Sequence, residues 1–492
     1  MFELETASNP EKLRRIAIDP VSRVEGHGKV TLLLDEANKV HQVRLHIVEF
    51  RGFERFIEGR PYWEVPVTVQ RLCGICPVSH HLAAVKAMDI IAGYGGRITP
   101  TAEKLRRLMH YGQVLQSHAV HFFHLASPDL LLGFDTEVAK RNIIGVVGEF
   151  PEVATQGVLL RKYGQEVIRY VSGKRVHGTG AVPGGANKAL SVAERDALRA
   201  DVEKMIKWSR DAVHLVKRLH QTNPAFYNGF GNFDSSMMGL VDERGALDLY
   251  HGGLRARDAK GGTIFDHVDY STYESVLDEE VKPWSYMKFP YIRSLGTADG
   301  WYKVGPLARV QVCDFIPSTL AEIERREMVD MGNGKPVHGT LLFHQARLIE
   351  MLHATELIRD LLDDPDIIGT DLMAEKGERV GEAVGVIEAP RGTLFHHYRV
   401  DENDQVTFCN LIVSTTNNNQ AMNEAIRTVA TQYLSGNEIT EPLLNHIEVA
   451  IRAYDPCLSC ATHALGQMPL QVELVDADGR LVHRMSKNMA GA

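Results

Sequence analysis

Two Cys-x-x-Cys pairs stand near opposite ends of this 492-residue chain, Cys73-Gly-Ile-Cys76 and Cys457-Leu-Ser-Cys460. Thiolate sulfur is a soft ligand that selects zinc, copper(I), iron–sulfur clusters and, in a suitable geometry, nickel. Because 381 positions (457 minus 76) separate the pairs, they can share one metal only if the fold brings both ends of the chain together. The spacing therefore predicts a buried metal site built from distant segments.

Two simpler interpretations compete with a catalytic metal. A structural zinc site usually closes a short loop between its pairs, and a redox-active Cys-x-x-Cys usually sits in a βαβ unit. The long separation and the flanking residues favour neither. Six cysteines are too few for a disulfide framework, which favours reduced thiols in a cytosol-like compartment, and Cys313 and Cys409 stand alone.

The composition is that of a globular protein with a sizeable core, with 44% hydrophobic residues, 24% charged residues and a net charge of -9. No long run of Lys or Arg is present, which argues against nucleic acid or an anionic membrane as the main partner. The start, Met1-Phe-Glu-Leu-Glu-Thr6, carries acids where a secretory signal needs basic residues, and nowhere do eighteen apolar residues run together. We therefore expect a cytoplasmic protein with no integral membrane segment.

The elements that must position the cysteines follow from periodicity and capping signals. Alternating apolar and polar residues predict a hairpin at 28–49 and further strands at 379–416. Capping signals predict helices that begin at or just after Cys76, at Thr99-Pro100 and at Ser191, where Glu194 completes a capping box. The second of these helices should run to about 126 and the third to about 220. Further helices are predicted from Thr319, with a capping box to Glu322, and at 419–434 and 441–453.

No repeat, low-complexity tract or linker divides the chain. Since the two cysteine pairs must also meet, we expect residues 1–463 to form a single intertwined domain. The predicted class is α+β, mainly α-helical, with long central helices and peripheral antiparallel strands. Residues 464–492 remain as a C-terminal extension that contains a small predicted hairpin at 472–483.

The residues that flank the cysteines resemble the two signatures of the large subunit of [NiFe] hydrogenases. These are Arg71-Leu-Cys73-Gly-Ile-Cys76-Pro-Val-Ser-His80 and Asp455-Pro-Cys457-Leu-Ser-Cys460-Ala-Thr-His463. The resemblance extends over the chain through five further motifs: Arg23-Val-Glu25-Gly-His27, Arg51-Gly-Phe-Glu54, Pro183-Gly-Gly185, Glu388-Ala-Pro-Arg391-Gly and Thr415-Thr-Asn-Asn418. Glu49-Phe-Arg-Gly-Phe-Glu54, Val78-Ser-His-His81 and Trp284-Ser-Tyr-Met-Lys-Phe-Pro290 are similar to the cytoplasmic NAD-reducing kind.

This resemblance implies a Ni–Fe centre with carbon monoxide and cyanide on the iron. Cys73 and Cys457 would bind nickel terminally, and Cys76 and Cys460 would bridge the two metals. Cleavage of dihydrogen releases a proton, for which a base must lie at the metals. The resemblance makes the Cys460 sulfur the first acceptor and Glu25 the proton relay, whereas Glu25 taken alone would more often be a solvated turn acid.

Further residues gain roles from the same resemblance. Arg391 would lie over the open side of the metals, held by a bidentate pair with Asp455. Many relatives steady this arginine with a second acid in a His-Asp-His sequence, where this chain has Gln116-Ser117-His118. Thr415 would hydrogen-bond cyanide, and His80 would donate a hydrogen bond to a thiolate.

An outer magnesium or similar ion would be bound by Glu54, His463 and the carbonyl of Leu411, a hard-ligand set of the kind such ions prefer. His463 by itself would more often be a packed histidine. The regularly spaced His118, His121 and His124 are predicted to be core and interface residues and not ligands.

Electrons must leave the buried site, yet Cys313 and Cys409 cannot hold a cubane, and the glycines at 178–184 lack the dinucleotide spacing. We expect no NAD, flavin or iron–sulfur cluster on this chain. The resemblance supplies these groups on partners: a small subunit with iron–sulfur clusters and diaphorase subunits with flavin and NAD. A maturation endopeptidase would remove residues 464–492, which uncut would hold Cys457 and Cys460 away from the site.

Two alternatives remain open at this point. The same catalyst could serve another acceptor, of the deazaflavin or heterodisulfide type. A non-enzymatic scaffold of the complex I type shares the ancestry but lacks the thiolates that this chain keeps.

Overall fold

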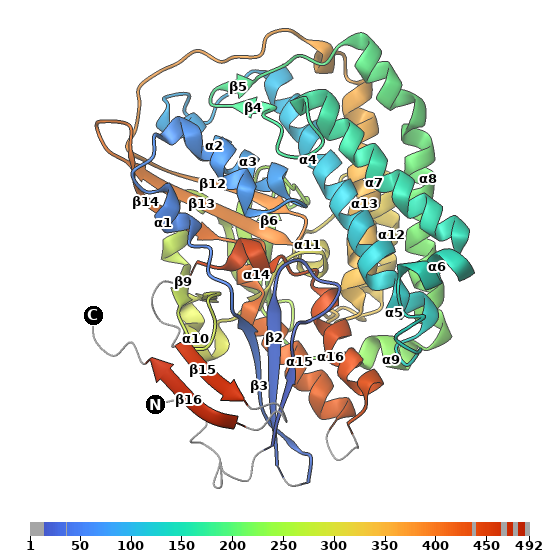
Figure 1. Cartoon of the computed structure of the whole chain (residues 1–492). Helices are drawn as coiled ribbons and strands as arrows, with labels where there is room; N and C mark the ends of the chain where they lie inside the picture. The colour runs from blue at the N-terminus through green and yellow to red at the C-terminus, as the bar shows by residue number, and fades with distance from the viewer. Residues whose placement is uncertain (1–13, 36, 435–438, 464–469, 476–480, 488–492) are drawn as a thin grey trace.

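The computed structural model of the chain (Figure 1) describes residues 14–35, 37–434, 439–463, 470–475 and 481–487. The acidic start of the chain and Glu36 of the predicted turn lie outside these ranges, as do residues 464–469, 476–480 and 488–492 of the extension. No helix of the described residues has the length and apolar character needed to cross a membrane.

Long helices form one side of the molecule (Figure 1). They are α4 (Pro100–Val120), α7 (Pro151–Ser172), α8 (Val192–Thr222) and α13 (Leu342–Asp363). Helix α4 packs against α7, and α13 packs against both α8 and α4. The predicted starts are confirmed: the Thr99 side chain accepts from the Ala102 amide at 3.2 Å, and Ser191 with Glu194 forms a complete capping box.

Two helix predictions differ from the structure. The helix expected from Thr99 to about 126 is α-helical only to Val120, after which residues His121–Ala126 form a π-helical turn and α5 (Ser127–Leu132) begins. A capping box at Thr319 is wrong, because Ser318 is the N-cap of α12 (Thr319–Asp330) and its hydroxyl bonds to His353. The carboxylate of Glu322 instead accepts from the Ile316 amide at 2.7 Å.

The remaining described helices are short or lie near the cysteines: α1 (Phe53–Ile57), α2 (Val65–Thr68), α3 (Pro77–Ile91), α6 (Ile143–Glu149), α9 (Pro224–Gly229), α10 (Gly296–Asp299), α11 (Pro306–Val312), α14 (Ser414–Asn417), α15 (Asn419–Tyr433) and α16 (Glu441–Ala453). The predicted helices after Cys76, at 419–434 and at 441–453 are confirmed as α3, α15 and α16.

The strands form small, mostly antiparallel sheets around the helices. The predicted hairpin at 28–49 is confirmed as β2 (Gly28–Leu34) and β3 (Val40–Ile47), to which the unpredicted β1 (Arg14–Ile18) adds a third strand. The strands predicted at 379–416 are confirmed as the sheet of β12 (Glu382–Ala389), β13 (Gly392–Val400) and β14 (Val406–Ile412). The other sheets comprise β4 (Ala181–Val182) with β5 (Gly185–Ala186), β6 (Ser236–Val241) with β7 (Gly253–Arg257), β8 (Thr263–Val268) and β11 (Tyr302–Lys303), β9 (Leu277–Glu280) with β10 (Phe289–Ile292), and β15 (Leu470–Val475) with β16 (Leu481–Lys487). Among these described strands, only β11 pairs in parallel, with β6.

The sheet of β12, β13 and β14 is covered on both faces, which explains why nearly every residue of β12 and β13 is buried. Helix α3 packs against β12 and β13, and a small apolar cluster that includes Met238, Val386 and Phe395 joins this sheet to β6 and β7. The turn between β12 and β13 consists of Pro390 and Arg391, with Ala389 paired to Gly392.

The segments that carry the two cysteine pairs meet inside the molecule. In Figure 1 the blue strand β3 lies beside the red helix α15, and the blue helix α1 lies beside the orange strand β14. Helix α1 contacts β14, α15 contacts β3, and α14 contacts the 3-10 turn Leu458–Ala461. This arrangement brings together the segments that carry both cysteine pairs.

Candidate metal centre

The four paired cysteines converge at one buried point. One sulfur from each of Cys73, Cys76, Cys457 and Cys460 lies within 4.8 Å of the others. The Sγ atom of Cys457 is 3.3 Å from that of Cys73 and 2.9 Å from that of Cys460, and Cys76 is 3.9 Å from Cys460. All four side chains are at most 5% exposed. The predicted convergence is confirmed, and in the described residues no other group of three or more His, Cys, Asp or Glu side chains is placed to hold a metal.

The first pair lies where a 3-10 turn (Val69–Leu72) gives way to α3. Cys76 is the N-cap of α3, and the Cys73 sulfur accepts from the amides of Ile75 at 3.2 Å and of Cys76 at 3.3 Å. Hydrogen bonds from the neighbouring thiols, Cys457 first, hold the pKa of Cys73 well below its usual range. Cys73 is therefore prepared as a thiolate, the form that binds metals.

The second pair follows α16. Cys457 precedes the 3-10 turn that contains Cys460, and its amide donates to the Thr415 hydroxyl at 2.9 Å. Burial raises the pKa of both Cys457 and Cys460 well above the usual range. A dication supplies the charge that buried thiolates need, since a coordinating thiol is deprotonated by the metal it binds.

Glu25 lies directly against this second pair. Its backbone forms a parallel bridge with Cys457, and its carbonyl accepts from the Leu458 amide at 2.9 Å. Its Oε2 atom accepts from the Cys457 thiol at 3.0 Å and from the Ser459 amide at 3.1 Å. The carboxylate is half-buried, and the sulfur that it contacts is that of Cys457.

Arg391 is buried beside the sulfurs and pairs with Asp455. Its Nε donates to the Asp455 carbonyl at 2.5 Å and its Nη2 to Oδ1 at 3.1 Å, so the contact divides between backbone and carboxylate instead of forming the expected bidentate pair. Burial works against its charge, but Asp455 and the cysteine sulfurs raise the pKa of Arg391 well above its usual value. Its Nη1 atom has no hydrogen-bond partner among the described residues, and neither has the Ser117 hydroxyl.

A second arginine fixes the turn that carries Arg391. Arg309 of α11 is 1% exposed and uses its guanidinium to bind Glu350 through two bonds of 2.6 Å and Glu388 through one of 2.8 Å. It also donates to the carbonyls of Ala389 at 2.6 Å and Pro390 at 3.1 Å, the two residues before Arg391. Helices α11 and α13 thereby hold this turn in place.

A small cavity adjoins the sulfurs of Cys76 and Cys457 and is lined by Arg391, Thr415 and His80, among others. The unpartnered Nη1 of the buried Arg391 at such a cavity fits a small anionic ligand next to the metals. Burial lowers the pKa of His80 to about 4, so the ring is neutral at pH 7, and its Nδ1 lies 3.1 Å from Nε2 of His396. The expected hydrogen bond from His80 to a thiolate stays a prediction.

The residues expected to bind an outer ion lie nearby. Glu54 in α1 is buried, and its Oε1 accepts from the Leu411 amide at 2.9 Å and from Lys288 at 3.0 Å. Burial raises the pKa of Glu54, an effect that Lys288 opposes. His463 is 2% exposed, burial lowers its pKa to about 3, and neither ring nitrogen has a hydrogen-bond partner among the described residues. Its neutral, unpartnered nitrogens fit a metal ligand, whereas the Glu54 charge is already paired.

The histidines set aside from the site are accounted for by the core. His118 bonds to Glu350 at 3.2 Å, and His121 bonds to the Arg452 carbonyl at 2.6 Å, both fully buried. His124 is partly exposed. The sequence alone indicated no role for Arg309 or Lys288; Lys288 stands inside the motif at 284–290, but the partners of either residue depend on packing.

Comparison with known proteins agrees with this geometry. Residues 51–135 and 231–463 match the family described as nickel-dependent hydrogenase, and residues 15–50 match one described as HoxL-like. The beta subunit of the NAD-reducing hydrogenase HoxS of Cupriavidus necator is 47% identical over 487 residues, which cover 96% of this chain and 100% of that protein. The F420-non-reducing hydrogenase vhc of Methanococcus voltae has one subunit that is 41% identical over 462 residues, 93% of this chain and 96% of that protein.

Among solved structures, an NAD+-reducing [NiFe]-hydrogenase in the H2-reduced state matches with a TM-score of 0.89 and 57% identity, over 92% of this chain and 99% of that chain. The chain belongs to the nickel-dependent hydrogenase family, as a large subunit of the [NiFe] type. Within that family it is similar to NAD-reducing hydrogenases. Its sequence is 47% identical to the Cupriavidus necator subunit and 57% identical to the matching chain of the solved structure. The predicted family and the mainly helical α+β fold are confirmed.

Proposed function

We propose that this chain is the catalytic subunit of a cytoplasmic hydrogenase that cleaves dihydrogen reversibly into protons and electrons and passes the electrons, through partner subunits, to NAD(P)+. The observation that carries the proposal is the convergence of four buried cysteine sulfurs from both ends of the chain within 4.8 Å. The 47% identity to a subunit of an NAD-reducing hydrogenase supports the choice of acceptor.

The sulfurs of Cys73, Cys76, Cys457 and Cys460 are the donor set that would hold the Ni–Fe centre. That centre, with carbon monoxide and cyanide on the iron, supplies the redox chemistry of dihydrogen cleavage when bound. Arg391 would present its unpartnered Nη1 to the anionic cyanide, and Thr415 would lie at the same cavity. Asp455 keeps the guanidinium in position.

The proton leaves through the protein. The contact of 3.0 Å between Cys457 Sγ and Glu25 Oε2 supports Cys457, in place of Cys460, as the sulfur that holds the proton first. Glu25 then takes the proton at Oε2 and passes it outward, for which its half-buried position is suited. The Ser459 amide, 3.1 Å from the same oxygen, orients the carboxylate.

Glu54, His463 and the Leu411 carbonyl would hold magnesium or a similar ion. The unpartnered nitrogens of His463 support this assignment, and Lys288 would share the Glu54 carboxylate with the ion.

Electrons require partners. Cys313 and Cys409 are both buried, and burial raises their pKa, as expected of inert core thiols. A small subunit with iron–sulfur clusters would accept the electrons, and diaphorase subunits with flavin would reduce NAD(P)+. The similarity to F420-non-reducing hydrogenases, at 41% identity, favours a second candidate in which the same catalytic chain serves a different acceptor, such as a heterodisulfide-reducing partner.

Residues 464–492 would be removed after His463 by an endopeptidase during maturation. The Thr462 carbonyl accepts from the amides of Gly52 at 3.2 Å and Arg51 at 3.4 Å, so the segment that ends at His463 has its own anchor at the start of α1. The four sulfurs lie together in the uncut chain, which does not support the idea that the extension holds Cys457 and Cys460 away.

The experiment is metal analysis of the purified complex together with hydrogen-dependent reduction of an artificial electron acceptor. Nickel with activity is expected, together with more iron than nickel, because the partner iron–sulfur clusters add to the one iron of the centre; zinc at full occupancy without activity would overturn the proposal. Glu25→Gln should keep the metals yet stop the exchange of D2 with solvent protons, because the amide cannot carry the proton. Full exchange in this variant would remove the relay role from Glu25.

A further inference from the structure

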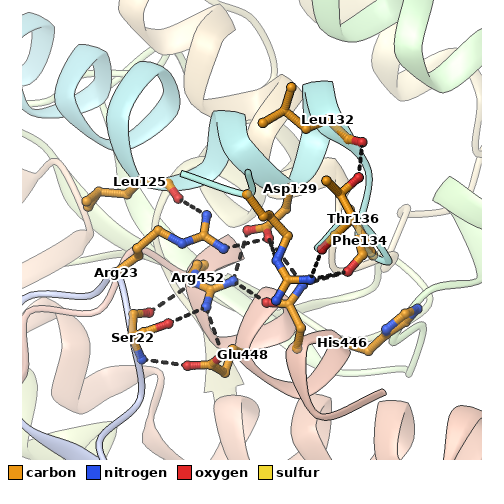
Figure 2. Close-up of polar contacts among 12 residues, drawn as sticks. Ser22, Arg23, Leu125, Asp129, Leu132, Phe134, Thr136, His446, Glu448 and Arg452 are labelled. Carbon is orange, nitrogen blue, oxygen red and sulfur yellow. Dashed lines mark hydrogen bonds and ion pairs between the residues drawn. The ribbon is translucent and has the colours of Figure 1, made fainter. Parts of the chain in front are cut away.

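Asp129 is a buried carboxylate surrounded by three arginines. Asp129 of α5 is 2% exposed, and its Oδ1 accepts from Arg23 Nη2 at 2.6 Å while its Oδ2 accepts from Arg452 Nη1 at 2.9 Å. Arg141 lies 3.7 Å from Oδ1, and Asn445 donates to the same oxygen at 3.2 Å. We call these five residues the Asp129 hub; Figure 2 labels Asp129, Arg23 and Arg452 of the hub together with several of its neighbours.

One arm of the hub leads to Glu25. Arg452 donates to the Ser22 carbonyl at 3.0 Å and to its hydroxyl at 2.9 Å, so a single guanidinium binds both Asp129 and the start of the Glu25 loop (Figure 2). Arg23, two residues before Glu25, has a φ of 54°, a backbone conformation that non-glycine residues rarely adopt. Its side chain is anchored to Asp129 and to the Leu125 carbonyl at 2.7 Å, which the π-helical turn presents.

The other arm leads to Cys457. Arg452 lies in the last turn of α16, five residues before Cys457, and its carbonyl accepts from the Asp455 amide at 2.9 Å and from His121 at 2.6 Å. The arms meet where the Glu25 carbonyl accepts from the Leu458 amide and the Glu25 carboxylate contacts the Cys457 sulfur. A displacement of either arm therefore changes the distance between these two groups.

Asp129 is the most buried of the carboxylates that contact the hub arginines. Glu448 and Glu441 also contact hub arginines, but their side chains are 13% and 49% exposed, against 3% for Asp129. Removing one partner from a buried ion pair leaves the other charge buried without compensation, which destabilises the surrounding structure strongly.

We propose that the Asp129 hub is a positioning device that holds the Glu25 carboxylate against the Cys457 sulfur, with Asp129 as a positioning residue for proton transfer. The effect on turnover rests on the proposed function, because Glu25 has its relay role there. The effect on the position of Glu25 is independent of the proposed function, because it concerns contacts within the chain itself.

The first test measures position. In the purified complex, Asp129→Asn should make the Leu458 and Ser459 amides exchange with deuterated water at least about tenfold faster, since both donate to Glu25. The matched control is Asp89→Asn, because Asp89 is also 2% exposed and paired to a buried arginine, Arg106, but outside the site. Arg23→Lys, a milder change that keeps the charge and loses the guanidinium fork, serves if Asp129→Asn does not fold.

The second test measures function. D2 exchange with solvent, normalised to nickel, should fall at least about tenfold in Arg23→Lys and in Asp129→Asn, with no further loss when either is combined with Glu25→Gln. If Glu25→Gln itself keeps full exchange, the relay role fails and the amide measurement still decides the positioning role. Unchanged amide exchange in both hub variants, or an equal effect of Asp89→Asn, overturns the inference.

Discussion

Arg309→Lys is the sharpest test of how the fold holds Arg391 beside the cysteine sulfurs. Arg309 makes five buried hydrogen bonds, three to the carboxylates of Glu350 and Glu388 and two to the carbonyls of the turn before Arg391. A lysine keeps the positive charge but has three N–H donors in place of five. The substitution therefore removes the fork that joins two helices to this turn while leaving the net charge unchanged.

The magnitude follows from this count. At least two of the five acceptors lose their partner, and a buried acceptor left unsatisfied costs about 1–3 kcal/mol, so the variant should lose about 2–6 kcal/mol of stability. A displacement of Arg391 by about 1 Å is expected to lower turnover per nickel by about tenfold to a hundredfold.

Arg106→Lys is the matched control. Arg106 also makes five hydrogen bonds, to Asp89, Val182 and Gly185, and is 1% exposed, but it does not contact the turn that carries Arg391. The Arg106→Lys variant should lose a similar amount of stability and keep the turnover of the wild type. The assay is hydrogen-dependent dye reduction normalised to nickel content, alongside the rate of thermal inactivation.

A double-mutant cycle separates positioning from general damage. In an Arg391→Lys background, Arg309→Lys should lower turnover less than it does in the wild type, because its effect passes through Arg391. The reasoning is refuted if the two losses are additive, or if Arg106→Lys reduces turnover per nickel as much as Arg309→Lys.

Three further outcomes are expected. Cys460→Ser should abolish nickel binding and activity, because a hydroxyl is a poor ligand for a soft metal, while Cys409→Ser in β14 should keep both; nickel retained by Cys460→Ser would contradict the assignment. Lys288→Met should lower the free energy of unfolding by about 3–5 kcal/mol, because it leaves the buried Glu54 unpaired. Adding Glu54→Gln to this variant should recover part of the loss, and no recovery would argue against the pairing. Burial lowers the pKa of His110 to about 4, below its ordinary 6.5. Between these pH values the unfolded chain binds a proton that the folded chain does not. The free energy of unfolding should therefore fall by up to about 3 kcal/mol as the pH falls from 6.5 towards 4. His110→Gln should flatten this loss, measured as unfolding free energy at both pH values, and an unchanged pH slope would contradict it.

Much of the fold could be predicted from local signals. The hairpin of β2 and β3, the start of α3 after Cys76 and the capping box of α8 each depend on residues that are neighbours in the chain. Where tertiary contacts compete, local signals were insufficient. The Glu322 carboxylate bonds to the Ile316 amide instead of completing a cap at Thr319, and the helix after Thr99 passes into a π-helical turn at His121.

The site shows the same division. The types and spacing of Cys73, Cys76, Cys457 and Cys460 predicted a soft-metal site for which distant segments of the chain must meet, and the four sulfurs do meet. Only the tertiary structure decided that Glu25 contacts Cys457, that Arg309 supports the turn before Arg391, and that Asp129 joins the two arms. The physical reason is that ligand chemistry belongs to the side chain itself, whereas a hydrogen bond between residues far apart in the chain exists only where packing places donor and acceptor within about 3 Å of each other.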